Sequence, residues 1–328
     1  MSRSHPNHRH FPPGPAAFPT SGGNRAGASS APRGVLLWLA AFVVPVLPPP
    51  AGAAEPPERI VSIGGAATEI VHALGMGGDV VAVDLSSTYP PEVRQLPQVG
   101  YVRSISPEGV LSMEPDLIVA TGALGPPAAR SMMERLDVRT IWLPDPASYE
   151  DLAVSVRRVG AALGREKEAG EILESVEEDL AAAREKASRW ENRKPTVVFF
   201  LEPPGAGGGG MAGGRDSRAD ALIRLAGGEN AADGFSGFQP VSRESLLAMD
   251  PDVILVAESE GHGGSPASIR ALKESAALSR TNAVRTGAVH GVPLDDLAFG
   301  PRLGEAALRW NALLAAAAEG GEEPDTGG

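Results

Sequence analysis

The sequence predicts an α/β fold of two lobes, each built on a mostly parallel sheet and joined to the other by a long backbone α-helix. Three observations indicate this fold class. Strand patterns alternate with helix patterns in two separate regions, a stretch of helical composition lies between those regions, and one fifteen-residue unit occurs once in each. Short, almost wholly apolar strands that alternate with helices are typical of a parallel sheet covered on both faces.

The first alternating region predicts four strands and three helices. The strands are expected at 59–64, 80–84, 116–120 and 138–143, and the helices at 68–75, 106–113 and 126–137. Threonine often caps a helix N-terminus and glycine often follows a helix C-terminus. We therefore expect Thr68 to cap the first helix and Gly75 to end it.

A long helical stretch follows, from residue 149 to about residue 193. Ala, Leu, Glu, Arg and Lys dominate it, and Leu152, Val156 and Val159 recur at helical spacing. Glycine weakens a helix interior, so one break is expected near Gly164.

The second alternating region resumes the strand and helix pattern. Strands are expected at 196–202, 252–257 and 288–293, one helix at 219–228, and a terminal helix from about 302 to 318.

An internal repeat links the two regions. Residues 106–120 read SPEGVLSMEPDLIVA, residues 242–256 read SRESLLAMDPDVILV, and seven of the fifteen positions are identical without a gap. A helix followed by Pro-Asp and a strand is common in α/β proteins, which is the alternative explanation. One copy in each region favours two similar, Rossmann-like lobes. Ligands favour such domain interfaces, and a helical strut limits closure to a small rocking motion.

The composition excludes several functions. The 328 residues include 29 Lys and Arg, 41 Asp and Glu, and no cysteine. Residues 1–54 hold four arginines and no acid, so the remainder has 25 basic and 41 acidic residues, a formal net charge of −16. A body that acidic has no electrostatic basis for binding nucleic acid. Without cysteine there is no disulfide, thiolate metal site, cysteine nucleophile or lipid-modified cysteine anchor.

The N-terminal region has the features of a secretion signal. An apolar core from Val35 to Leu47 follows Arg33 and is 13 residues long, shorter than the roughly 20 residues of a membrane-spanning helix. A cleaved signal is therefore favoured over an anchor. The expected organisation is a disordered or misassigned start at 1–33, a signal peptide at 34–54, an N-terminal α/β lobe at 55–148, a linking helix at 149–194, and a C-terminal α/β lobe at 195–328 with the terminal helix and a disordered tail.

Signatures of an enzyme are hard to find. The sequence has no GxSxG, HExxH, Walker or CxxC motif, and the glycine-rich run at 205–214 lacks the Gly-Lys-Ser/Thr ending of a nucleotide loop. His72 and His290 lie within an expected helix and strand, and only His262 lies in a glycine-rich loop free to reach a cleft. These are the three histidines that follow the expected signal peptide, and three scattered histidines do not make a zinc site.

Tyr101 is the most informative of the three tyrosines. It lies in PQVGYVRSIS, a loop expected at the carboxyl edge of the first sheet, where open α/β folds place their ligands. A loop tyrosine is more often a surface hydrogen-bonding group, but a phenolate can also ligate ferric haem iron. Arg103 could lower the pKa of that phenol or pair with a propionate.

Several segments resemble a known family. RIVSIGGAATEIVHALG, VVAVDLSSTYPPEVRQLPQVGYVRSISPEGVLSMEPDLIVA and, in the second half, GGRDSRADALIRLAGGENAADGFSGFQPVSRESLLAMDPDVILV and LDDLAFGPR resemble the helical-backbone class of periplasmic binding proteins. Within that class they are most similar to the haem-binding components of bacterial haem-uptake ABC transporters, chiefly through IGGAATEI and LPQVGYVR. The similarity covers roughly residues 58–315.

The resemblance implies a periplasmic protein without catalysis that carries ferric haem (hemin). Its partners would be an ABC permease and its ATPase, with an outer-membrane haem receptor system upstream, and it would be a monomer. Cobalamin or a ferric siderophore is the alternative cargo within the class. An enzyme on the same α/β scaffold is the alternative outside it, although no clustered acid, base or nucleophile supports one.

The resemblance also implies a set of site residues. Tyr101 matches the axial iron ligand and Arg103 the arginine beside it. Some relatives add a histidine after the first strand of the second lobe, where this chain reads LEPPGAGGGGMAGG. Five-coordinate iron is therefore expected, or a weak sixth ligand from Met211, with Glu202 more remote. Residues near Met211 and Leu297 would contact the macrocycle.

Transporter docking is expected at two acidic residues. Proteins of this class present one exposed glutamate per lobe to arginines of the permease. The matching residues are Glu108 and Glu244, at the same place in the two repeats. Equivalent acids on equivalent helices suit a pseudo-symmetric permease, while each could also be an ordinary solvated glutamate.

Overall fold

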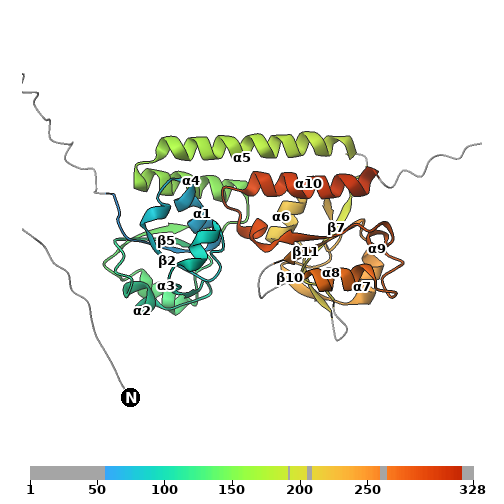
Figure 1. Ribbon diagram of the computed structural model, residues 1–328, viewed down its shortest axis with the longest axis horizontal. Coiled ribbons are helices and arrows are strands. Elements are labelled where there is room, and N and C mark those ends of the chain that lie inside the picture. Colours follow the sequence, from blue (N-terminus) through green and yellow to red (C-terminus); the bar gives the residue numbers. More distant parts are fainter. Residues whose placement is uncertain (1–55, 191–192, 205–208, 259–263, 320–328) are drawn as a thin grey trace, which may run out of the picture. The chain divides into compact units, whose positions relative to one another are not determined.

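The computed structural model describes residues 56–190, 193–204, 209–258 and 264–319, all within the unit Ala54–Gly328 (Figure 1). Two separate main sheets lie within this unit. We call residues 56–148 the N-lobe and the described part of 195–319 the C-lobe. The predicted α/β class is confirmed. The exact domain boundaries remain predictions, and the expected start, signal peptide and tail lie outside the described residues.

The N-lobe sheet is parallel, in the order β2-β1-β5-β6. The four predicted strands are β1 (Ile60–Ile63), β2 (Val80–Val83), β5 (Leu117–Thr121) and β6 (Arg139–Leu143). The helices are α1 (Gly65–Ala73), α2 (Pro107–Leu111) and α3 (Pro127–Met133), with short 3₁₀ turns at Gly77–Asp79 and Pro91–Gln95. Every residue of β1 and β5 is buried, which fits the apolar runs that predicted them.

The start of α1 differs from the prediction. Gly64 occupies the N-cap with φ 99°, and Thr68 lies inside the helix, fully buried. A Cβ at Gly64 would lie 2.6 Å from the hydroxyl of Thr121, so both the backbone angle and the space require glycine. The prediction that Thr68 caps the helix is wrong because this tight turn, rather than a side-chain cap, starts α1. Gly75 follows the helix end with φ 80° as expected.

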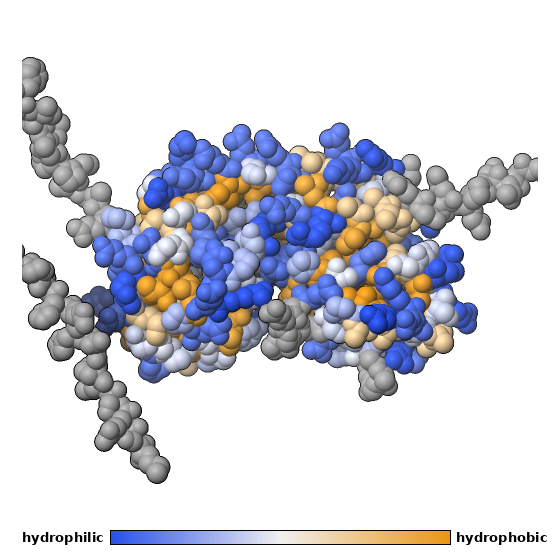
Figure 2. All heavy atoms as spheres, in the orientation of Figure 1, coloured by the Kyte–Doolittle hydropathy of each residue, from blue (hydrophilic) through white to orange (hydrophobic). Residues whose placement is uncertain are grey.

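The predicted linking helix is two helices. α4 (Tyr149–Leu163) ends at Gly164, whose φ is 66°, and α5 (Glu166–Ala187) follows, so the predicted break is confirmed. α5 buries one face, formed by Ala169, Leu173, Val176, Leu180 and Ala183. Figure 1 shows α5 running along both α4 and the terminal helix α10 (Leu303–Glu319). Its outer surface, at the top of Figure 2, is hydrophilic.

The C-lobe sheet has the order β10-β8-β7-β11-β12, with β9 paired to β7. Its strands are β7 (Thr196–Glu202), β8 (Gly210–Gly213), β9 (Glu229–Asn230), β10 (Phe238–Val241), β11 (Val253–Glu258) and β12 (Val289–Pro293). The helices are α6 (Arg218–Leu225), α7 (Arg243–Met249), α8 (Pro266–Lys273) and α9 (Asn282–Thr286), with a 3₁₀ turn at Leu294–Ala298. β8 runs antiparallel to both β7 and β10. β8 and β10 were not predicted because their sequences, GMAG and FQPV, lack a strand-like apolar pattern.

The repeat is confirmed as a structural unit. Ser106 and Ser242 cap α2 and α7, and their hydroxyl oxygens accept hydrogen bonds from the backbone N–H groups of Gly109 (3.0 Å) and Ser245 (3.1 Å). Each helix leads into a strand inside its sheet, β5 or β11. Within the described ranges, no helix is at once long enough and apolar enough to cross a membrane.

Candidate functional site

A buried carboxylate organises the carboxyl edge of the N-lobe sheet. Asp84 follows β2 directly and is fully buried. Its oxygens accept hydrogen bonds from the backbone N–H groups of Gly64 (2.7 Å), Ser86 (2.9 Å) and Val102 (3.1 Å). They also accept from the hydroxyls of Ser86 (2.6 Å) and Ser87 (2.7 Å). Three separate loops therefore meet at one side chain.

Tyr101 lies on a small hairpin at this edge. β3 (Gly100–Tyr101) pairs antiparallel with β4 (Ser104–Ile105), so the segment expected to be a loop is a short β-ribbon. The Tyr101 side chain is 44% exposed. A large, partly apolar ring is thus presented to the surface at the edge where ligands bind in open α/β sheets.

Backbone hydrogen bonds hold the hairpin on both sides. The N–H of Leu85 donates to the carbonyl of Gly100 (2.8 Å), and the N–H of Gly125 donates to the carbonyl of Val102 (2.9 Å). The Val102 side chain is 7% exposed and packs in the N-lobe core. The base of the hairpin is therefore fixed, while the Tyr101 ring remains accessible.

Arg103 and Leu85 lie in the hairpin or bond to it, and Tyr89 follows Leu85 in the segment after β2. Arg103 is exposed and belongs to the hairpin turn. Leu85, whose backbone contacts Gly100, is 53% exposed, and Tyr89 is 38% exposed. Large apolar side chains are usually buried, so Leu85, Tyr89 and Tyr101 together give this edge apolar contact surface.

An arginine of the C-lobe reaches into the N-lobe. Arg302, just before α10, donates from Nη2 to Glu69 Oε1 (2.7 Å) and from Nε to Glu69 Oε2 (3.1 Å). Nη2 also donates to Asp295 (2.8 Å), and the guanidinium carbon lies 3.7 Å from the centroid of the Tyr89 ring. Glu69 belongs to α1, so this ion pair ties the two lobes beside an exposed residue of the candidate site.

Burial dominates the electrostatics of this junction. The pKa of Glu69 is raised to about 7, chiefly because burial disfavours its charged form. The hydrogen bond and the charge of Arg302 lower this pKa, and the charges of Asp295 and Asp296 raise it further. The pKa of Asp296 is also raised by burial, against hydrogen bonds from Trp310 and Arg309.

A second arginine links the lobes at a more open place. Arg218, the first residue of α6, pairs with Asp145 of the N-lobe and donates from Nη1 to the carbonyl of Leu297 (3.3 Å). The Leu297 side chain is only 7% exposed and belongs to the hydrophobic core. Leu297 therefore presents little apolar surface to a ligand. The structure does not support its expected contact with a macrocycle.

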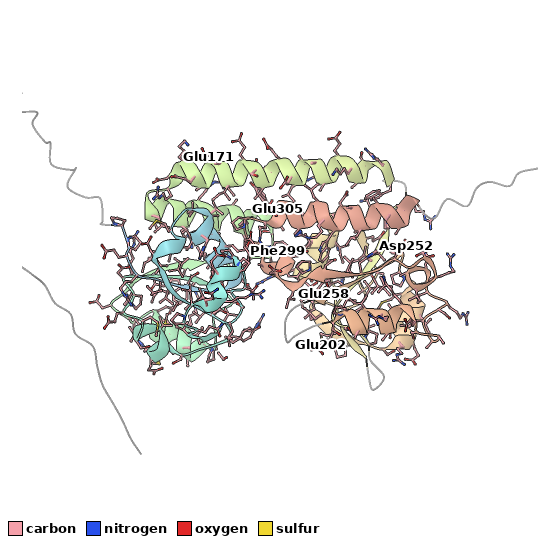
Figure 3. The ribbon with its side chains drawn as sticks, in the orientation of Figure 1. Glu171, Glu202, Asp252, Glu258, Phe299 and Glu305 are labelled. Atoms are coloured by element: carbon pink, nitrogen blue, oxygen red, sulfur yellow. The ribbon has the colours of Figure 1, made fainter. Side chains whose placement is uncertain are left out.

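The C-lobe offers two acids and a methionine at one edge. Glu202 ends β7 and is exposed, Glu258 ends the adjacent β11, and Met211 on β8 lies opposite Glu202 and is half-buried. Figure 3 labels Glu202 and Glu258 on the same side of the C-lobe. The candidate His262 lies outside the described residues. Among the residues the structure describes, no group of three or more His, Cys, Asp or Glu side chains could hold a metal ion.

Glu108 and Glu244 occupy matching positions. Each is the second residue of its helix, in the first turn of α2 or α7, and each is exposed. Hydrogen bonds to its own backbone and to Ser242 lower the pKa of Glu244. The predicted structural equivalence is confirmed, whereas docking stays a prediction.

The structure adds residues that the sequence did not single out. Asp84, Leu85 and Tyr89 all follow β2, in the segment DLSSTYP, and an acid directly after a buried strand was the one available signal. Arg302 had no such signal because its partner, Glu69, lies 233 positions away.

Comparisons with known proteins agree with this fold. The structure is similar to that of the periplasmic heme-binding protein RhuT from Roseiflexus sp. RS-1, with 36% sequence identity and a TM-score of 0.71 over 80% of this chain and 99% of that one. It is also similar to the periplasmic heme-binding protein BhuT in complex with two hemes, with 32% identity and a TM-score of 0.71 over 79% of this chain and 98% of that one.

Two relatives found by sequence are more distant. The chain is 28% identical over 250 residues to the uncharacterized ABC transporter substrate-binding lipoprotein YvrC of Bacillus subtilis (strain 168), covering 75% of this chain and 76% of YvrC. It is 27% identical over 218 residues to a vitamin B12-binding protein of Yersinia pestis (strain Pestoides F), covering 66% of this chain and 74% of that protein. A family model described as periplasmic binding protein matches residues 60–294. The chain therefore belongs to the periplasmic binding protein family and is a substrate-binding protein of the ABC importer class.

Proposed function

We propose that this protein carries haem to its ABC importer and that the phenolate of Tyr101 binds the ferric iron. The observation that carries the proposal is the placement of Tyr101, 44% exposed at the carboxyl edge of the N-lobe sheet on a hairpin whose base is fixed. An anionic oxygen ligand suits ferric haem iron, and a fixed base holds that ligand in one geometry.

Arg103 supports the same ligand chemistry. It is exposed on the turn of the hairpin that presents Tyr101. A nearby cation favours the phenolate over the phenol, and a guanidinium also pairs well with a carboxylate such as a haem propionate. The first role stabilises the charged form of the iron ligand, and the second gives the haem a polar anchor beside that ligand.

The apolar side chains around the hairpin suit a flat macrocycle. Leu85 and Tyr89 are exposed on the N-lobe side, and Met211 is half-buried on β8 of the C-lobe. Burying apolar surface supplies most of the affinity for such a ligand. The Met211 thioether is the first candidate for a weak sixth iron ligand, with Glu202 after it, and Leu297 is a minor contact at most because of its burial.

Relatives favour haem over the alternative cargoes. The two solved structures above, at 36% and 32% identity, are named heme-binding proteins, whereas the vitamin B12-binding relative is 27% identical. That relative makes cobalamin the second candidate, and a ferric siderophore is a further alternative within the class. Cobalamin has no use for an anionic iron ligand at Tyr101, so the two cargoes predict different effects of removing its hydroxyl.

The proposed setting extends the family assignment. The mature protein would be monomeric in the periplasm after cleavage of the signal at 34–54, without a lipid anchor, although the relative YvrC is named a lipoprotein. It would receive haem from an outer-membrane receptor system and deliver it to the permease and its ATPase. Glu108 and Glu244 would dock on the permease through their matching positions on α2 and α7.

A titration of the purified protein with hemin, followed by visible absorption, tests the proposal. A saturable Soret shift with a high-spin ferric tyrosinate charge-transfer band is expected in the wild type and in Tyr89→Phe, a matched control that loses another exposed hydroxyl. Tyr101→Phe should lose the band. A parallel titration with cyanocobalamin should give no saturable change. Saturable binding of cyanocobalamin, together with no Soret shift on adding hemin, would contradict haem as the cargo and indicate cobalamin.

A further inference from the structure

We propose that Asp84 is a positioning residue whose buried carboxylate fixes the Tyr101 hairpin so that the phenol group meets the haem iron in a single geometry. This inference rests on the function proposed above. It adds a residue that is fully buried and acts through its neighbours without touching the ligand.

The hydrogen bonds of Asp84 divide between its two oxygens. Oδ1 accepts from the Gly64 N–H (2.7 Å) and the Ser87 hydroxyl (2.7 Å). Oδ2 accepts from the Ser86 N–H (2.9 Å), the Ser86 hydroxyl (2.6 Å) and the Val102 N–H (3.1 Å). A carboxylate offers about four acceptor sites, so its hydrogen-bonding capacity is filled by neutral donors from three loops.

The bond to Val102 acts directly on Tyr101. The N–H of Val102 lies in the same planar peptide unit as the carbonyl of Tyr101. Fixing that N–H on Asp84 therefore fixes the orientation of the peptide that leaves Tyr101. The N–H of Gly125 holds the other side of Val102 through its carbonyl (2.9 Å). Together these bonds restrain the backbone from which the Tyr101 ring extends.

A network of buried hydroxyl groups connects the carboxylate to the interior of the N-lobe. The Ser87 hydroxyl contacts Thr68 Oγ1 (2.7 Å), which contacts Ser62 Oγ (2.8 Å). Ser62 belongs to β1 and Thr68 to α1, and both are fully buried. Asp84 is thus connected to the rigid interior of the lobe, which lets a loop carry a precisely placed ligand group.

Asparagine cannot replace this carboxylate. Its amide has one oxygen, and its NH₂ group only donates. In one orientation the NH₂ faces the N–H groups of Ser86 and Val102, and in the other it faces the N–H of Gly64. Serine hydroxyls can rotate to accept a hydrogen bond, but backbone N–H groups cannot, so Asp84→Asn must break at least one backbone anchor.

The first test compares Asp84→Asn with Ser86→Ala, which removes one hydroxyl donor and leaves the carboxylate and all three backbone anchors in place. Asp84→Asn should release hemin about 10-fold faster, as loss of a partner that orients a metal ligand typically does. Its tyrosinate charge-transfer band should shift and broaden, while Ser86→Ala keeps the wild-type band and rate. If Asp84→Asn keeps both as well, the inference is overturned while the proposed function stands. If the wild type lacks a Tyr101-dependent band, the proposed function fails instead.

A second test needs no haem. Hydrogen exchange of the Val102 amide in the free protein should be about 10-fold faster in Asp84→Asn than in the wild type, with the amide of Ile118 inside the sheet as an unchanged internal reference. An unchanged Val102 rate contradicts the inference. Should Asp84→Asn not fold, the wild type alone decides, because a Val102 amide that exchanges at the rate of an unstructured peptide has no such anchor.

Discussion

Arg302 and Glu69 form a bidentate ion pair, with donor–acceptor distances of 2.7 and 3.1 Å, between the start of α10 and α1. Both side chains are largely buried, at 18% and 4% exposure. The same guanidinium covers the ring of Tyr89, so a contact that joins the lobes also orders one wall of the proposed haem site. Because Arg302 contacts both Glu69 and Tyr89, this junction couples the orientation of the lobes to the geometry of the site. Breaking a buried ion pair leaves an uncompensated charge.

The pair should make stability depend on pH. The pKa of Glu69 is raised from 4.5 to about 7 by burial, so the folded chain keeps a proton that the unfolded chain releases near pH 4.5. The stabilising contribution of this group is therefore fully present below pH 4.5 and is lost as the pH rises through 7. Raising the pH from about 5 to about 8 should lower the Tm of the wild type by about 5 °C more than that of Glu69→Gln. Equal Tm changes in the two proteins would contradict this assignment.

Removing the arginine should cost more here than at the open junction. At pH 8, where Glu69 is ionised, Arg302→Met removes one partner of a buried ion pair, which costs about 3 kcal/mol. Arg218→Met removes a more exposed pair with Asp145, whose side chain is 54% exposed, and such pairs contribute about 0.2–1 kcal/mol. Urea unfolding of both variants measures the difference. A loss for Arg218→Met that matches or exceeds the loss for Arg302→Met would contradict the assigned roles.

Two glycines that flank α1, Gly64 before it and Gly75 after it, allow backbone strain to be compared with steric overlap. Gly64 and Gly75 both have positive φ, 99° and 80°, but a Cβ at Gly64 would lie 2.6 Å from Thr121 whereas Gly75 has open space. Gly75→Ala should destabilise the protein by about 1 kcal/mol through backbone strain alone. Gly64→Ala adds a steric overlap and should cost about 3 kcal/mol. Thermal unfolding of the two variants checks the order, and equal losses would show that space at Gly64 is unimportant.

The acidic docking pair should affect transport and leave ligand binding intact. Glu108→Ala and Glu244→Ala each remove an exposed carboxylate at a matching position, so each should weaken stimulation of the importer ATPase by about 10-fold. Glu171→Ala, which removes an exposed glutamate of α5, is the control and should have no effect. Hemin affinity should be unchanged in all three variants. Full stimulation of the importer ATPase by the double variant Glu108→Ala/Glu244→Ala would contradict docking through these two residues.

The sheets could be predicted because each strand carries its own local signal. β7 was predicted at 196–202 and is observed at Thr196–Glu202, since TVVFFLE begins with five β-branched or aromatic residues and is followed by Pro203. β8 and β10 have no such run. They form because the edge of a sheet already in place offers hydrogen-bond partners, which a local pattern cannot reveal.

Candidate site residues came from single segments of the sequence. Tyr101, Glu108 and Glu244 were proposed because their segments resemble the family, and the roles of all three stay predictions. The role of Asp84 depends on three loops converging on one side chain, and the Arg302–Glu69 pair joins positions 233 residues apart. Thr68 was misread as a helix cap because its hydroxyl serves a buried network that only the folded loops create.

Resonance Raman spectroscopy of the hemin complex, excited in the charge-transfer band, tests the central claim most directly. The account predicts phenolate vibrations of an iron-bound tyrosine that shift on ring-deuteration of tyrosine. These vibrations should be present in the wild type and in Tyr89→Phe and absent in Tyr101→Phe. Phenolate vibrations that persist in Tyr101→Phe, or a wild-type complex without them, would contradict iron binding by Tyr101.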